Sequence, residues 1–329
     1  MLGDVFQSEA WFANLLAHGF ERPPRGHWAL PLPSRSGEPV HLHLMQESSA
    51  GSLCSLSNYY SCLYGPAGSA RAIQDVSVAQ WQAAAHALRQ LPGSSVLRLQ
   101  PLDADGAWLA GLEGGLRAAG YWTDRFFCFG NWYQPVPGGG FADYWRQRPS
   151  ALRHSVERGR RRLDRAGAWR IDILADASPG LDVCLAAYLA VYAQSWKSPE
   201  PCPNFMPALV RMAAREGWLR LGVLWLGEQP LAAQVWLVCD GKANIYKLAY
   251  VKGQERLSAG SVLTAALMQY AMDVDQVLEV DYLSGDDAYK RDWMAMRRER
   301  VGLVAFDPRR LSGLLAAGRH FAGKTLRRR

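Results

Sequence analysis

The sequence predicts an α/β protein with two domains, and three observations indicate this. Its 329 residues exceed what one average core requires, and its 49% hydrophobic and 20% charged residues are typical of a globular chain, not a disordered one. Helical and strand periodicities alternate along the chain. A Pro- and Gly-rich segment at residues 134–140 follows an aromatic stretch, so we expect a first domain over residues 1–138 and a second over 139–329.

The first domain is predicted to be of mixed α/β order. Apolar alternation indicates strands at residues 41–46, 96–100 and 125–133. Apolar residues at helical spacing indicate helices at residues 79–91 and 108–119.

The second domain has a more regular predicted order, in which a three-stranded meander stands between helices. The Asp240-Gly241 pair inside the meander is among the stronger hairpin signals that a sequence offers. The predicted helices are 141–165, 181–196, 205–216 after a cap at Asn204, 261–271 and 288–296. The predicted strands are 169–174, 219–226, 230–239, 242–251, 277–283 and 301–306.

The net charge of +7 is concentrated in two stretches. Residues 146–170 hold nine Arg against two acids, and residues 297–329 hold ten Lys or Arg against two acids. These stretches indicate either an anionic partner (an acyl carrier protein, a tRNA or an anionic membrane surface) or solvated helix faces. For residues 309–329 an amphipathic, surface-seeking helix is an alternative, with its apolar side formed by Leu311, Leu314, Leu315 and Phe321.

Several function classes are disfavoured. No run of 18 apolar residues and no basic-then-apolar start is present, so we expect a cytoplasmic protein, or one peripheral to the inner face of the membrane. His41 and His43 alternate on a strand without a visible third ligand, and the six cysteines are scattered, so we expect no metal. No Gly-x-Ser-x-Gly motif is present, which argues against covalent catalysis.

The loop before the helix at residue 261 has the composition of an anion site. Ser258, Ala259, Gly260 and Ser261 are small enough for a ligand to approach the backbone, and the helix dipole favours negative charge there. Arg256 stands just before them and is able to reach a phosphate. A pyrophosphate is the expected guest, and an ordinary helix start is the alternative.

The order of these elements resembles the GNAT acyltransferase superfamily, and more specifically its tandem-domain branch of Fem-type transferases and CelD-like enzymes of polysaccharide gene clusters. The resemblance covers most of the chain. It rests on Ser57–Ser61, Asn131–Tyr133, the basic helix 152–163, Ser195–Lys197, Leu231–Gln234, Tyr246–Tyr250, Ser258–Leu263, Asp281–Asp286, Tyr289-Lys290 and Trp293. It departs from the branch at Ala259, where a proline is usual. The resemblance implies tandem GNAT-like domains, each with a mixed central sheet flanked by helices.

The resemblance also implies roles for individual residues. Donor phosphates would lie at residues 256–261, and a backbone N–H near Leu248–Tyr250 would contact the carbonyl of acetyl-CoA or another acyl-CoA. Tyr289 stands where GNAT enzymes often place the tyrosine that protonates the leaving thiolate. Fem-type relatives use an aminoacyl-tRNA as donor instead.

Asp281 is the second candidate for catalysis. It lies in an apolar strand, with Glu279 on the same face by alternation. A buried carboxylate requires a partner, so Lys247, Lys290 or a ligand is expected beside it, and its role is either general base or structural ion pair. Other expected substrate contacts are Trp196, Lys197, Tyr246, Lys247 and Lys290, with Asn58, Tyr59 and Tyr60 as the wall contributed by the first domain.

We therefore expect a cytoplasmic tandem-GNAT acyltransferase that acts by direct transfer, without a metal. It would move an acyl group, acetyl first, from CoA to an amine of a small molecule or sugar used in envelope or polysaccharide assembly. One alternative is Fem-like aminoacyl transfer from tRNA. The other is a non-catalytic protein that uses its basic surfaces on nucleic acid or anionic lipid.

Overall fold

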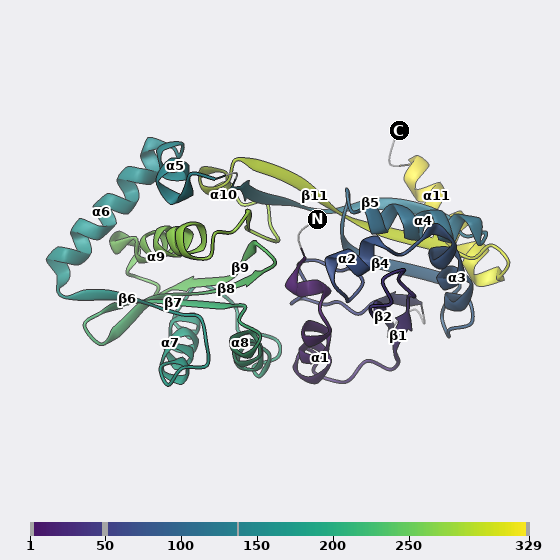
Figure 1. Ribbon diagram of the computed structural model, residues 1–329, viewed down its shortest axis with the longest axis horizontal. Coiled ribbons are helices and arrows are strands. Elements are labelled where there is room, and N and C mark those ends of the chain that lie inside the picture. Colours follow the sequence, from purple (N-terminus) through teal and green to yellow (C-terminus); the bar gives the residue numbers. More distant parts are fainter. Residues whose placement is uncertain (1–2, 48–51, 137, 327–329) are drawn as a thin grey trace. The chain divides into compact units, whose positions relative to one another are not determined.

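A computed structural model describes residues 3–47, 52–136 and 138–326, and its α/β class is the predicted one (Figure 1). The strands are β1 (His27–Pro31), β2 (His41–Gln46), β3 (Leu53–Ser55), β4 (Val96–Asp103), β5 (Trp122–Pro135), β6 (Trp169–Leu174), β7 (Leu219–Leu226), β8 (Gln229–Cys239), β9 (Lys242–Tyr250), β10 (Glu279–Asp281) and β11 (Met296–Phe306). The helices are α1 (Glu9–His18), α2 (Ala70–Gln74), α3 (Val78–Leu88), α4 (Ala107–Ala118), α5 (Gly140–Arg146), α6 (Ser150–Ala166), α7 (Leu181–Ala193), α8 (Phe205–Arg215), α9 (Ala259–Gln269), α10 (Lys290–Trp293) and α11 (Leu311–Leu326).

The chain divides into two compact units. The first consists of Phe6–Gly130 and Glu299–Arg329, and the second consists of Asn131–Arg298 with the N-terminal stretch up to Val5. This division differs from the predicted one, which assigns the basic C-terminal segment to the second domain. The reason is pairing within the sheet: β11 is antiparallel to β4 from Arg300 to Phe306, so the end of the chain returns to the first unit.

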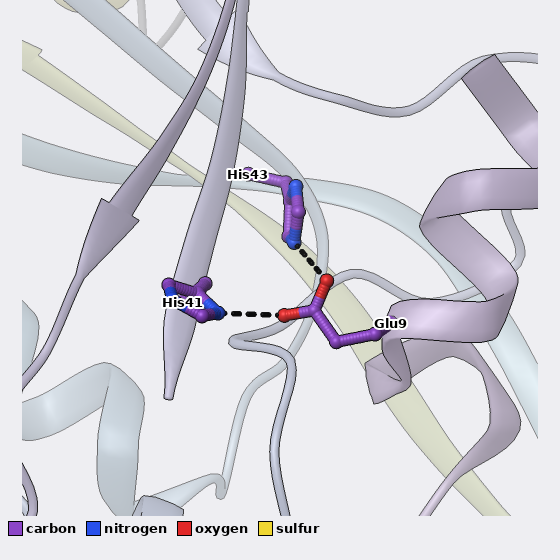
Figure 2. Close-up of side chains that lie close together, drawn as sticks. All are labelled: Glu9, His41 and His43. Atoms are coloured by element: carbon purple, nitrogen blue, oxygen red, sulfur yellow. Dashed lines mark hydrogen bonds and ion pairs between the residues drawn. The ribbon is translucent and has the colours of Figure 1, made fainter. Parts of the chain in front are cut away.

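The first unit contains the strand order β1-β2-β3-β4-β11-β5. Its sheet is mixed, because β3 and β4 are parallel while β1–β2, β2–β3 and β4–β11 are antiparallel. Helix α3 begins with a capping box of Ser77 and Gln80. At the start of α1, Glu9 faces two histidines of β2 (Figure 2).

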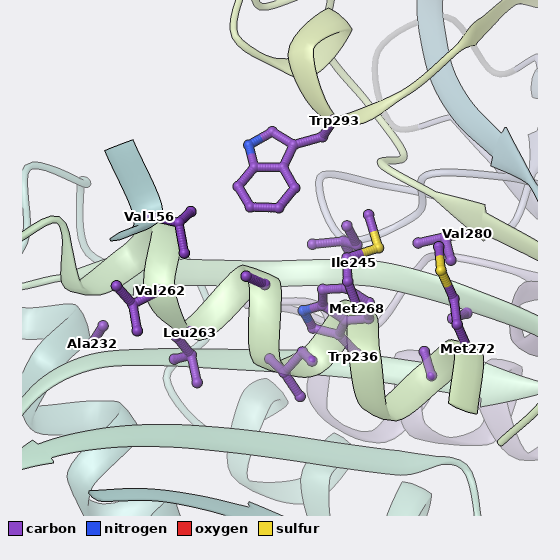
Figure 3. Packing of buried hydrophobic residues seen from close by; sticks show 14 of the residues in the cluster. Val156, Ala232, Trp236, Ile245, Val262, Leu263, Met268, Met272, Val280 and Trp293 are labelled. Atoms are coloured by element: carbon purple, nitrogen blue, oxygen red, sulfur yellow. The ribbon is translucent and has the colours of Figure 1, made fainter. Parts of the chain in front are cut away.

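The second unit contains the strand order β5-β10-β9-β8-β7-β6, with the predicted antiparallel meander at its centre. Asp240 and Gly241, which join β8 to β9, both have positive φ (46° and 76°), as a tight hairpin turn requires. Helices α6 and α9 lie on one side of this sheet, and α7 and α8 lie on the other (Figure 1). The core between α9 and the sheet includes Trp236, Ile245, Met268, Met272 and Val280 (Figure 3).

Strand β10 is shorter than the predicted strand at residues 277–283. It pairs in parallel with Lys242–Asn244 only, although β9 continues to Tyr250. The cause is a turn stabilised by Asp281, whose Oδ1 accepts the N–H of Leu283 at 2.7 Å, while Leu283 has a φ of +54°. The chain therefore leaves the sheet after Asp281, and β9 and β10 separate.

The predicted helix at residues 141–165 is two helices, α5 and α6, because Pro149 ends the first and precedes the second. The buried positions of α6 follow helical spacing at Leu152, Val156, Gly159 and Leu163. The arginines between residues 158 and 165 lie on exposed positions, which both the solvated-face and the anionic-partner alternatives allow.

The C-terminal segment forms the predicted helix, α11. Leu311, Leu314 and Leu315 are exposed on it, as the surface-seeking alternative expects. Within the described part of the chain, no helix combines the length and apolar character that crossing a membrane requires.

Helix α6 is in close contact with the start of α9 at Gly159. A Cβ at this position would lie 2.9 Å from Cγ2 of Val262 and 3.0 Å from the carbonyl oxygen of Leu257. We predict that Gly159→Ala lowers the free energy of unfolding by about 1–2 kcal/mol, because steric overlap outweighs the gain in helix propensity.

Chemical denaturation measures this effect. The matched control is Gly114→Ala in α4, where nothing lies within 4 Å of the added methyl group. That change should stabilise the protein by about 0.5–1 kcal/mol. Equal effects of the two substitutions would contradict the close contact.

Candidate active site

A cavity of about 550 Å³ lies within the second unit, where β9 and β10 separate. Four elements border it: β8, β9, the start of α9 and the start of α6, together with the segment that follows β10. Its lining residues are Ala151, Leu152, Ser155, Trp196, Gln234, Leu248, Ala249, Tyr250, Gly260, Ser261, Thr264, Tyr282, Tyr289, Asp292 and Trp293. Four residues of the sequence-predicted donor site, Leu248, Tyr250, Gly260 and Ser261, are thus brought together.

The start of α9 presents backbone donors to this cavity. The first helical hydrogen bond runs from the N–H of Val262 to the carbonyl of Ser258 at 3.0 Å, so the N–H groups of residues 259–261 have no intrahelical acceptor. Ser258 is the N-cap in a left-handed conformation (φ 52°) and makes no side-chain cap. These N–H groups and the helix dipole together make this end of α9 suited to binding an anion.

Gly260 has a specific steric role. A Cβ on this residue would lie 3.2 Å from Cδ1 of Tyr250, so a larger side chain would meet the tyrosine ring inside the cavity. The ring of Tyr250 also packs on Trp196, with their centroids 4.4 Å apart. The absence of a side chain at residue 260 therefore keeps the backbone accessible.

Strand β9 also presents backbone donors. The N–H of Val251 donates to the carbonyl of Leu231 on β8 at 2.9 Å. Because hydrogen-bond direction alternates along an antiparallel strand, the N–H groups of Leu248 and Tyr250 point away from β8. That is the edge which β10 has left, and both residues line the cavity.

Gln234 and Thr264 form a polar contact that sequence reasoning missed as a site feature. Gln234 is 1% exposed, and its Nε2 donates to Oγ1 of Thr264 at 2.8 Å and to the carbonyl of Gly260 at 3.1 Å. Its Oε1 accepts from the indole of Trp236 at 2.9 Å. These bonds fix the first turn of α9 against β8. A glutamine in an otherwise apolar strand was the available signal.

Tyr289 lines the cavity and is in contact with a buried tyrosine. Its ring meets Tyr282 edge-on, with centroids 5.7 Å apart, and the two side chains share a hydrogen bond. Burial and the carboxylate of Asp287 raise the pKa of Tyr289 to about 12. The residue is therefore a neutral phenol, able to donate a proton, throughout the physiological range.

Asp281 has a structural role. It is 0% exposed, its Oδ2 lies 2.5 Å from Nη2 of Arg298 and 3.0 Å from Nζ of Lys242, and Nδ2 of Asn131 donates to its Oδ1 at 2.5 Å. Glu279 also pairs with Arg298, as expected because Glu279 and Asp281 lie on the same face of β10. The predicted partners, Lys247 and Lys290, are not its ion-pair partners among the described contacts. Of the two predicted alternatives, this enclosure favours the structural ion pair, and a role as general base stays a prediction.

The two other lysines also have structural contacts. Nζ of Lys290 donates to the carbonyls of Tyr282, Ser284 and Gly285, and the residue is 4% exposed. It stabilises the loop after β10 and is not among the residues that line the cavity, and its contact with a substrate stays a prediction. Lys247 is 9% exposed and pairs with Glu200 at 2.9 Å. Its neighbour Tyr246 is buried.

The loop after α7 separates two cavities of the second unit. Trp196 borders the first cavity, and Lys197 borders a second one of about 350 Å³. The second cavity is lined by Tyr188, Leu189, Tyr192, Ala193, Lys197, Pro199, Glu200, Pro203 and Met206. Burial, and secondarily the charge of Lys247, lower the pKa of Lys197 to about 8. It is the only cation among these lining residues.

The remaining predicted residues have other positions. Arg256 is exposed, and its carbonyl accepts from Nη1 of Arg162 at 2.6 Å. In the first unit, Asn58 donates to the carbonyl of Gly19 and accepts the N–H of Tyr60. Tyr60 is buried and Tyr59 is 62% exposed. A role of residues 58–60 in the acceptor site stays a prediction.

Comparison with known proteins relates part of the second unit to one protein family. Residues 150–291 match a protein family described as acetyltransferase (GNAT) domain, and this range contains nearly all of the cavity lining. No curated protein sequence matches the chain.

Solved structures share the fold of the whole chain. FemX is similar over 93% of this chain and 92% of its own, with a TM-score of 0.66 and 10% identity. The C-terminal domain of a protein named as a lysylphosphatidylglycerol synthetase, from Agrobacterium fabrum, covers 91% of this chain and 88% of its own, with a TM-score of 0.55 and 15% identity. L-PGS from Bacillus licheniformis covers 98% and 99%, with a TM-score of 0.53 and 12% identity.

The buried ionic cluster around Asp281 gives a test of its structural role. We predict that Asp281→Asn lowers the free energy of unfolding by about 1–3 kcal/mol, because a neutral amide cannot accept all the hydrogen bonds of this buried carboxylate, while Glu279 and Asp4 keep Arg298 and Lys242 paired. Urea denaturation measures the change.

The control is Asp182→Asn. The side chain of Asp182 is 79% exposed and pairs with Arg211 on the surface, so a change below about 1 kcal/mol is expected. If Asp281→Asn were as mild as this control, the ionic cluster would not be a structural requirement.

Proposed function

We propose that this protein transfers an acyl group, acetyl in the first instance, from an acyl-CoA to an amine, because residues 150–291 match a family described as acetyltransferase (GNAT) domain. One observation carries the proposal. The backbone donors of β9 at Leu248 and Tyr250 and those of α9 at Gly260 and Ser261 border the same 550 Å³ cavity. This spacing suits a long donor that has a phosphate group at one position and a reactive carbonyl at another.

The donor's pyrophosphate would accept hydrogen bonds from the N–H groups of Ala259, Gly260 and Ser261. The positive end of α9 adds attraction. Arg256 and the exposed arginines of α6 supply further positive charge near this end, since α6 packs on α9 at Gly159. Ala259 does not weaken the site, because the donors are backbone groups.

The reaction we propose is direct. The amine attacks the thioester carbonyl, and the negative charge that develops on the carbonyl oxygen is stabilised by the N–H of Leu248 or Tyr250. The C–S bond then breaks, the sulfur takes a proton from the hydroxyl of Tyr289, and the proton that the attacking nitrogen loses returns to the tyrosine oxygen. A thiol has a pKa near 8.5, so the thiolate is already a fair leaving group, and the neutral phenol of Tyr289 assists its departure as a hydrogen-bond donor.

The acceptor amine would approach from the side of the second cavity. Trp196 and Lys197 are consecutive residues, so this cavity and the donor cavity lie on either side of one short loop. Aromatic residues and a lysine on its wall suit a small molecule or sugar that carries an amine and an anionic group. Use of such an acceptor in polysaccharide or envelope assembly is part of the proposal.

A second candidate is Fem-like transfer from an aminoacyl-tRNA. Two observations favour it: the similarity to FemX over 93% of the chain, and the row of exposed arginines on α6 beside the start of α9. A nucleic-acid donor would use these arginines on its phosphates. An acyl carrier protein, as an acidic donor protein, would use the same surface.

Donor binding decides between these candidates. We predict that isothermal titration calorimetry detects acetyl-CoA binding with one site per chain, and that Gly260→Val weakens it at least tenfold by filling the space beside Tyr250. Gly114→Val, at an open surface position, is the control and should bind as the wild type does. Longer acyl-CoAs, acyl carrier protein and tRNA are titrated in parallel. No binding by any CoA ester would reject the leading proposal, and binding of tRNA alone would support the second candidate.

Removing the hydroxyl group of Tyr289 tests its proposed role as proton donor. We predict that Tyr289→Phe lowers kcat by about 10²-fold, the low end for loss of a general acid, because a thiolate is a fair leaving group. KM for the donor should change little, since the ring remains. Tyr270→Phe, at a position outside the cavity lining, is the control. An unchanged kcat in the Tyr289 variant would remove this residue from the mechanism.

A further inference from the structure

We propose that Glu9, His41 and His43 bind a divalent transition metal ion, with Zn²⁺ as the best match. These residues belong to the first unit and are not part of the cavity described above. The ion would connect α1 to β2, because Glu9 comes from the helix and both histidines come from the strand (Figure 2).

The geometry brings three donor atoms together. Nδ1 of His41 lies 2.7 Å from Oε1 of Glu9, and Nε2 of His43 lies 3.0 Å from Oε2. One ligand atom from each residue lies within 4.8 Å of the others. His41 and His43 reach the same carboxylate because alternate residues of a strand point to the same face. A tetrahedral zinc ion with bonds of about 2.0–2.2 Å fits between three atoms at this spacing after a small shift.

Two imidazoles and one carboxylate form a donor set that zinc uses when a fourth position remains for water or another ligand. The site is accessible for such a ligand: the side chains of Glu9 and His41 are 56% and 33% exposed. Hard cations such as Mg²⁺ and Ca²⁺ prefer oxygen ligands only, so a set with two nitrogens favours a transition metal.

A third histidine orients one of the ligands. Nε2 of His27 lies 3.0 Å from Nδ1 of His43, on the ring nitrogen opposite the one that faces Glu9. Histidines that bind metals usually have their second nitrogen hydrogen-bonded in this way, which fixes the ring and leaves the other nitrogen for the ion. The ring of His43 is also stacked on Phe12, with centroids 4.3 Å apart, and its side chain is only 5% exposed. His43 is thus held in place before any ion binds.

The alternative explanation is a surface cluster of hydrogen bonds without an ion. It accounts for the two contacts with Glu9, and metal titration separates it from the proposal. The full-length protein, treated with a chelator and then dialysed, is titrated with ZnCl₂ in a calorimeter. We expect one Zn²⁺ per chain and an increase in Tm when zinc is added, because an ion that binds only the folded state stabilises it.

Three variants make the test specific. Glu9→Gln and His41→Ala should each weaken Zn²⁺ binding at least tenfold, and both change partly exposed side chains that folding does not depend on. His27→Asn should weaken it by 10- to 100-fold, as expected when a residue that orients a ligand is changed. His86→Ala, on an exposed position of α3, is the control and should bind zinc as the wild type does.

The proposal is rejected if the wild type binds no stoichiometric zinc. It is also rejected if Glu9→Gln and His41→Ala, shown to be folded by circular dichroism, bind zinc with wild-type affinity, because the ion would then lie elsewhere. Neither result depends on a transferase assay, so the metal site and the proposed function are tested independently.

Discussion

The separation of β9 from β10 is the constraint on which the candidate site depends. The strands pair for three residues, and β9 then continues to Tyr250 with one edge unpaired by β10. Asp281 produces this separation, since its carboxylate accepts the N–H of Leu283 and turns the chain out of the sheet. Arg298 and Lys242 balance its charge, so the same buried residue both ends the strand and anchors it. The cavity and the outward-facing N–H groups of Leu248 and Tyr250 follow from that geometry.

The second unit contains two kinds of charged group, buried ones that are paired and exposed ones on a helix surface. Around Asp281 the charges are buried and paired, which fixes strands of the sheet to one another. On α6 the arginines are exposed, while Leu152, Val156 and Leu163 bury the opposite face and Gly159 lets the helix approach α9. Because of this arrangement, positive charge lies near the free N–H groups of α9 without a desolvation cost. A flexible, exposed set of cations suits the phosphate groups of a donor better than a rigid buried one.

Much of the fold could be predicted from the sequence, because local sequence patterns determine it. The meander, the Asp240-Gly241 hairpin and the helix after Ser258 follow from periodicity and turn chemistry. The residues at the start of α9 that border the cavity could be named from the sequence because they are contiguous, and their role in holding a donor stays a proposal. The partners of Asp281 were not, since Asn131 and Arg298 are far from it in sequence and only tertiary pairing brings them together. Two other features could not be predicted for the same reason. They are the position of Glu9 beside His41 and His43, and the pairing of β11 within the first unit.

The central claim is that backbone N–H groups at the separation of β9 and β10 hold the acyl donor. Amide hydrogen exchange with and without coenzyme A tests it most directly, because it reports on these groups themselves. The account predicts slower exchange on coenzyme A binding at residues 259–261 and at Leu248 and Tyr250, with little change on the opposite side of the sheet at α8. Protection confined to other segments, while these amides exchange as before, would contradict it.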